Sequence, residues 1–113
     1  MNQTELVFSG KELASAGAKM ALMHAESVHE DWGAEACEYL EIFLRLHPGR
    51  EFMTEDVREY ATKRGLPKPP SLRAWGAVMQ RAQRAGIIRW AGNRQVRNRK
   101  AHHAVASVWV GVI

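Results

Sequence analysis

The stretch Lys68–Val112, KPPSLRAWGAVMQRAQRAGIIRWAGNRQVRNRKAHHAVASVWVGV, decides which fold the sequence predicts. Pro69 and Pro70 are disfavoured in a helix interior, and Ser71 is a typical N-cap residue, so a helix is predicted to begin here. Gly86 is expected to end that helix.

Two strands are predicted after this helix. Ile87–Trp90 suits a short strand, followed by a turn at Ala91–Asn93. The β-branched, alternating run Val105–Gly111 suits a returning strand, and the loop between the two strands is too charged to be buried. A helix followed by a hairpin with a basic loop is the second half of a winged helix-turn-helix, in which this loop is the wing.

The predicted helix has two chemically different faces. Its apolar residues Leu72, Trp75, Met79 and Ala82 recur at three- and four-residue spacing, so they are expected to point into a core. The opposite face combines a small residue with long polar side chains, which suits entry into the major groove of DNA. The DNA contacts predicted from this face and from the wing are Arg73, Ala77, Gln80, Arg81, Arg84, Arg94, Arg97, Arg99 and Lys100. Flanking phosphate contacts are expected from Lys63, Arg64 and Lys68.

Residues upstream of this stretch are predicted to be helical. One pattern begins at Gly10, and its helically spaced positions are Leu13, Ala16, Met20, Met23 or His24, and Ser27 or Val28, which are expected to form the buried face. A second pattern reaches Leu46, and we expect two helices rather than one continuous helix.

A third helix is expected with Thr54 as its N-cap and Gly65 at its end. Residues 1–9 fit either a strand or an arm packed on the body, and the sequence leaves this open. The predicted fold is mainly helical (α+β): a winged helix-turn-helix with a C-terminal two-stranded hairpin and an N-terminal helical extension.

Length and charge describe one domain with two unlike parts. The 113 residues suffice for a single domain with a modest core. Residues 1–47 form the acidic part, the helical extension and first helix, with three basic and eight acidic residues. Residues 48–113, the basic helix-turn-helix and wing, have thirteen basic and four acidic residues. Since eleven basic residues and no acidic one follow Glu59, a polyanionic partner is indicated.

Several classes of protein are disfavoured by the sequence. It contains no apolar run long enough to span a membrane and no signal-peptide pattern, so a cytoplasmic location is expected. Cys37 is the only cysteine, and the spacing of His24 with His29 does not suit a zinc-binding pair. We expect no metal and no cofactor.

Catalysis is also not indicated. A metal-dependent nuclease needs carboxylates beside the scissile phosphate, and none follows Glu59. The tryptophans Trp75, Trp90 and Trp109 are expected to pack in the core rather than to stack on bases.

The segments AWGAVMQRAQRAGIIRW and AHHAVASVWVGV, with the basic loop between them, resemble small proteins of loosely annotated function encoded by bacteriophages and prophages. The resemblance extends over most of the chain, including Thr54–Val57. It implies a winged-helix-like domain and a setting in phage DNA replication or regulation, inside a bacterial host cell. It carries over no catalytic residue.

Non-catalytic binding of duplex DNA is therefore the function predicted from the sequence. The main alternative is an adaptor that uses the winged-helix scaffold to bind a host protein, and a further one is a phage nuclease subunit. The acidic N-terminal helices are expected to lie opposite the basic half, where they would serve a homodimer or a protein partner without touching DNA.

The predicted wing gives a direct test. Arg97→Ala and Arg99→Ala are each expected to weaken binding to every duplex similarly, because phosphate contacts carry no sequence information. Fluorescence anisotropy with several unrelated duplexes measures this. An unchanged affinity for all of them would exclude the wing from contact with DNA.

Overall fold

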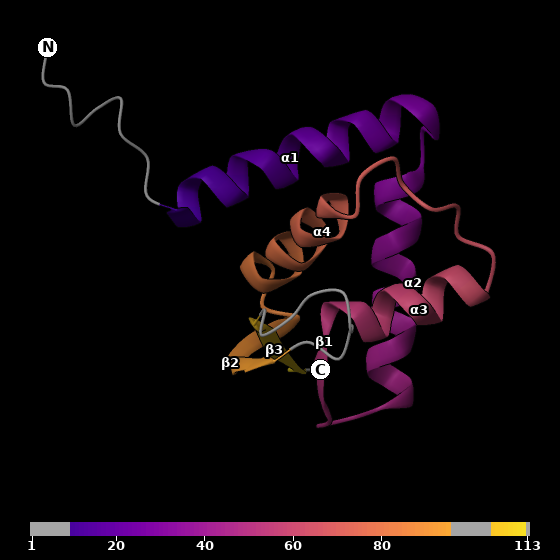
Figure 1. Ribbon diagram of the computed structural model, residues 1–113. Coiled ribbons are helices and arrows are strands. Elements are labelled where there is room, and N and C mark those ends of the chain that lie inside the picture. Colours follow the sequence, from indigo (N-terminus) through magenta and orange to yellow (C-terminus); the bar gives the residue numbers. More distant parts are fainter. Residues whose placement is uncertain (1–9, 96–104, 113) are drawn as a thin grey trace, which may run out of the picture.

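The computed structural model describes residues 10–95 and 105–112, with side chains from Ala14 onward in the first helix. The described residues form an α+β fold of four helices and three strands (Figure 1). In chain order these are α1 (Gly10–Val28), α2 (Trp32–Leu46), β1 (Glu51–Met53), α3 (Thr54–Lys63), α4 (Arg73–Arg84), β2 (Ile88–Gln95) and β3 (Val105–Gly111).

The strands form one antiparallel sheet in the order β1-β3-β2. The predicted returning strand is confirmed, but the prediction of a sheet with two strands is wrong. β1 pairs with the far edge of β3, placing Phe52 opposite Trp109. A strand of three residues has too little alternation to be recognised alone, and its partner lies more than fifty residues later in the chain.

β2 is longer than predicted. It continues through Ala91, Gly92 and Asn93, where a turn was expected, and ends at Gln95. The pairing register with β3 shifts between Trp90 and Asn93, which marks a β-bulge. Gly92, with φ of 117°, supplies the backbone conformation that such an irregularity needs.

The prediction of two N-terminal helices is confirmed, but the predicted buried face of the first helix is wrong. Met20 and Met23 are 71% and 70% exposed. The side chains that α1 buries lie on its opposite face and are mostly small: Ala18, Ala21, Leu22 and Ala25. Small side chains let α1 approach its neighbour α4 closely, and this gain in packing outweighs burial of the larger methionines.

Both helix starts in the second half lie one residue from the prediction. α3 begins at Thr54 with Met53 as its N-cap, and the Met53 backbone N–H donates to Asp56 Oδ2 over 2.8 Å. α4 begins at Arg73 with Leu72 as its N-cap, so Leu72 is exposed rather than buried. Gly86 follows the end of α4 with φ of 76°, as the predicted stop requires.

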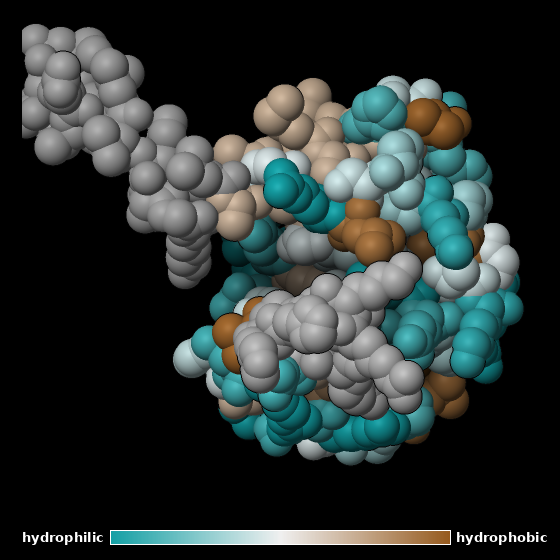
Figure 2. Space-filling model, viewed as in Figure 1, coloured by the Kyte–Doolittle hydropathy of each residue, from teal (hydrophilic) through white to brown (hydrophobic). Residues whose placement is uncertain are grey.

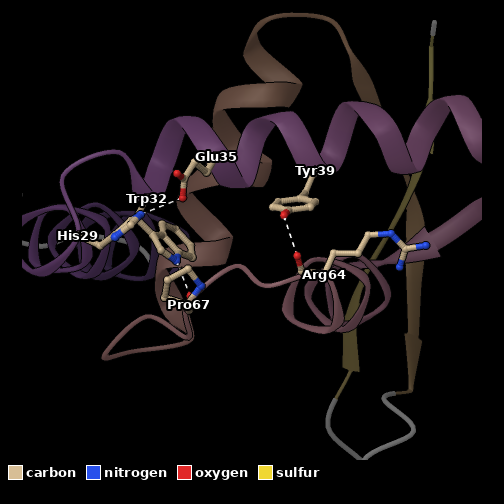
Figure 3. Close-up of polar contacts among 6 residues, drawn as sticks. All are labelled: His29, Trp32, Glu35, Tyr39, Arg64 and Pro67. Carbon is tan, nitrogen blue, oxygen red and sulfur yellow. Dashed lines mark hydrogen bonds and ion pairs between the residues drawn. The ribbon is translucent and has the colours of Figure 1, made fainter.

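Trp32 fixes the linker between α3 and α4. Its indole Nε1–H donates to the Pro67 carbonyl over 2.8 Å (Figure 3), and its ring meets that of Trp75 edge to face at 5.4 Å. Tyr39 also holds this region from α2, since its hydroxyl donates to the Arg64 carbonyl over 3.1 Å (Figure 3). These contacts explain how a stiff, proline-rich linker returns α4 to the core beside α2.

No helix within residues 10–95 is long and apolar enough to cross a membrane.

The Trp32 contact leads to a prediction about stability. Trp32 is 1% exposed, and Trp32→Phe leaves the Pro67 carbonyl without its donor and replaces the packed indole with a smaller ring. We expect the free energy of unfolding to fall by about 1–3 kcal/mol. Urea denaturation measures it, with Trp90→Phe as the matched control because Trp90 is 52% exposed. An equal loss in both variants would contradict the assigned role of Trp32.

Candidate nucleic-acid interface

The outward face of α4, predicted to enter DNA, lies against α1. The two helices run side by side (Figure 1), and the Ser15 hydroxyl of α1 donates to Gln80 Oε1 over 3.0 Å. A Cβ added to Gly76 would lie 3.6 Å from the Ala18 Cβ, which shows how closely the helices approach. The expectation that the N-terminal helices lie away from this face is therefore wrong.

The predicted contact residues of α4 consequently have different environments. Ala77 is 4% exposed, so the prediction that it lies on a free groove-facing surface is wrong. Gln80 is half-buried and paired with Ser15, whereas Arg73, Arg81 and Arg84 are exposed. A helix that must insert into the major groove needs its whole outward face free, and α4 does not offer one.

Two of these arginines lie beside other elements. A Cβ added to Gly17 would lie 3.3 Å from an Arg73 terminal nitrogen, so this guanidinium lies over α1. The Arg81 guanidinium lies close enough to the Cys37 thiol of α2 to favour its thiolate form. Burial raises the pKa of the Cys37 thiol above its ordinary value, while Arg81 opposes that shift.

In the hairpin, Arg94 is exposed and its guanidinium lies 3.7 Å from Glu51 Oε1 on β1. Arg97, Arg99 and Lys100 lie outside the described residues. Arg89 on β2 is exposed as well, and the prediction had not included it. Because Arg89 lies between the apolar residues Ile88 and Trp90, the sequence predicted only that it belongs to a strand.

A basic pocket lies between α3 and the linker to α4, with a volume of about 430 Å³. Arg58, Lys63 and Lys68 supply its cations, and Glu59 is the one carboxylate among its described lining residues. Sequence reasoning missed Arg58, although its place among charged residues on the exposed side of a short helix was a usable signal. Arg64 lies instead over the Tyr60 ring, 4.0 Å from its centre.

The second hollow is a cleft between α1, α4 and the sheet, called here the α1–α4 cleft. It consists of two adjoining pockets of about 420 and 600 Å³ that share Ala14, Gly76 and Gln80. The surface is hollowed below α1 (Figure 2), on the side where α4 lies (Figure 1). Gln80 is the one sequence-predicted contact residue that lines both pockets.

Trp90 lines the sheet side of this cleft. Core packing was predicted for three tryptophans: it is confirmed for Trp75 and Trp109 but wrong for Trp90, which is 52% exposed. Trp90 and Trp109 are opposite each other in the register of β2 and β3. The Trp90 side chain is only partly covered by its neighbours.

Among residues 14–95 and 105–112, no three His, Cys, Asp or Glu side chains are grouped so that they could hold a metal ion. The closest acid–histidine contact described is Glu35 with His29, 2.9 Å apart at the junction of α1 and α2 (Figure 3). It joins two half-exposed side chains and lines neither of the hollows above.

The Cys37 environment predicts a pH effect. Because only the thiolate is alkylated, a raised pKa moves the half-maximal rate of reaction with iodoacetamide above the pH found for a free cysteine. Arg81→Ala removes the group that lowers this pKa, so the midpoint is expected to move to still higher pH. Arg84→Ala, on the same helix and exposed, is the control. A lower midpoint in Arg81→Ala would contradict the assignment.

Comparisons of the chain with protein-family models, with curated proteins and with solved structures find no match. What the chain does must therefore be argued from its own residues and their arrangement.

Proposed function

We propose that this protein binds DNA without catalysis, holding the phosphate backbone with basic residues of its second half. The observation that carries this proposal is the absence of acidic residues after Glu59, where eleven basic residues occur. Among the described members of this set, Arg94 alone has a carboxylate within 4 Å. Exposed cations without internal counter-charges favour a polyanion.

The arrangement of elements supports a winged-helix assignment within this proposal. From α2 onward the order is helix, strand, helix, helix, strand, strand, and the early strand joins the late hairpin in one sheet. The α3–linker–α4 unit then corresponds to the helix-turn-helix, and the β2–β3 connection to the wing. α1 is an additional helix laid across α4.

The manner of binding differs from insertion of α4 into the major groove. α1 covers part of that face, at Gly76 and Gln80, so the phosphate backbone is the more accessible target for this fold. The basic pocket between α3 and the linker supplies one set of contacts, from Arg58, Lys63 and Lys68. Such contacts contribute affinity that depends on salt but not on sequence.

The setting belongs to the same proposal. A role in phage or prophage DNA replication or transcriptional regulation, in the cytoplasm of a bacterial host, rests on the resemblance of residues 74–90 and 101–112 to phage-encoded proteins.

The basic pocket provides the test. Lys63→Gln combined with Lys68→Gln is expected to weaken binding of a fluorescein-labelled mixed-sequence duplex several-fold at ~100 mM salt, through loss of phosphate contacts. Fluorescence anisotropy across a salt series should show the slope of log affinity against log salt reduced by about 2, one for each lysine.

Lys19→Gln combined with Arg45→Gln is the matched control, since it removes the same charge from exposed positions in the acidic half. Its slope is expected to stay unchanged. Equal losses in both double variants would mean that net charge alone, rather than the pocket, sets the affinity.

Absence of DNA binding even at low salt would contradict the proposal. It would favour the second candidate function, which is that of an adaptor that binds a host protein. The observation that favours the adaptor is the outer surface of α1, where the apolar side chains of Met20 and Met23 are exposed. That part of the surface is mostly pale brown, or mildly hydrophobic, in Figure 2.

A further inference from the structure

We infer that the α1–α4 cleft binds an unpaired nucleobase of a DNA strand, which stacks on Trp90. The inference rests on the proposed function and specifies the form of DNA: a single-stranded segment rather than a continuous duplex. The described residues that line the cleft belong to α1, α4, β2, β3 and the first residue of α3.

The dimensions of the cleft suit a nucleotide. Its larger pocket, of about 600 Å³, falls within the range of pockets that hold small organic ligands, and the smaller one of about 420 Å³ adjoins it. The two pockets together follow α4 from Arg73 to Gln83, a rise of roughly 15 Å at 1.5 Å per residue. A short strand of more than one nucleotide therefore has a path along this helix.

Trp90 offers the stacking surface. It is the most exposed of the four tryptophans, because Trp32, Trp75 and Trp109 are all buried. A large aromatic ring left half in water beside a hollow has apolar area still available for burial. Base–aromatic stacking is tolerant of sequence, since every base presents a π-face.

The other polar groups of the cleft match the edge of a base. Gln83 and Asn93 line it, and neither side chain makes a hydrogen bond with another described residue. Each amide offers both a donor and an acceptor, which is the pattern that base edges require.

The charge of the cleft suits a nucleic-acid strand. Its described lining residues include no aspartate or glutamate, and Arg73 lies at one end. The neutral amides of the cleft can contact a base, and the cation at its end can contact the phosphate of the same nucleotide. No carboxylate among the described lining residues repels that phosphate. The cover of α1 over α4 excludes a duplex groove from this surface but leaves the hollow beside it open to one strand.

The experiment measures binding of a fluorescein-labelled oligo(dT) strand and of a blunt mixed-sequence duplex by anisotropy, together with tryptophan fluorescence. For the unmodified chain we expect quenching by the single strand. Trp90→Ala is expected to weaken single-strand binding roughly 5- to 100-fold, the range of one lost base–aromatic stack, with duplex affinity unchanged. Trp90→Phe should retain most of the affinity.

Met23→Ala is the matched control, because it removes an exposed apolar side chain from the outer face of α1, away from the cleft. Thermal unfolding of each variant verifies that Trp90→Ala is folded. Asn93→Ala tests the base-edge contact separately, with an expected loss of a few-fold on the single strand only.

The outcomes separate this inference from the proposed function. Binding of both DNA forms with no effect of Trp90→Ala on either would overturn the cleft assignment and leave DNA binding intact. Absence of binding to both forms would overturn the two together. The last ligand tested is the mononucleotide dTMP. Quenching of tryptophan fluorescence by dTMP without binding of oligo(dT) would make the cleft a site for free nucleotides and overturn its assignment to a DNA strand.

Discussion

The contact between α1 and α4 is the constraint on which the functional surface depends. It is made by small residues, with Ala18 of α1 facing Gly76 of α4, and by one side-chain hydrogen bond from Ser15 to Gln80. Because Ala18 and Gly76 are both small, the helices approach closely where these residues meet. A residue larger than alanine at Gly76 would push α1 away and expose the part of α4 that α1 covers. The same contact forms one wall of the α1–α4 cleft.

Much of the fold was accessible from local sequence signals. Prolines before Ser71, the glycine at Gly86 and the alternation of Val105–Gly111 predicted α4 and β3 correctly, because these residues restrict the backbone by themselves. The strand Glu51–Met53 was not accessible, since three residues carry no periodicity and depend on pairing with β3. The length of β2 was missed because Gly92 and Asn93 are turn residues by preference, whereas pairing with Ser107 and its neighbours holds them in a bulged strand.

The site was less predictable than the fold. Spacing along α4 correctly placed Arg73, Arg81 and Arg84 on exposed positions, but it could not show that another helix lies across the same face. The face of α1 was misassigned for the same reason: hydrophobicity ranks methionine above alanine, while close packing against α4 selects alanine. Trp90 was assigned to the core by residue type, which does not reveal that its side chain is 52% exposed in the folded chain.

The structure separates two kinds of chemistry that nucleic-acid binding combines. Cations lie on the outer surfaces of α3, the linker and the hairpin, where contacts with phosphate are strong at low salt and are screened as salt rises. The cleft holds amides and indoles and a single described cation, Arg73, so its contribution depends on stacking and hydrogen bonding rather than on counterion release. Affinity from the first set is indifferent to the form of DNA, whereas the second set requires a base that is free of its partner. Under the proposed function, discrimination between paired and unpaired DNA belongs to the cleft, and it should persist at salt concentrations that weaken the phosphate contacts.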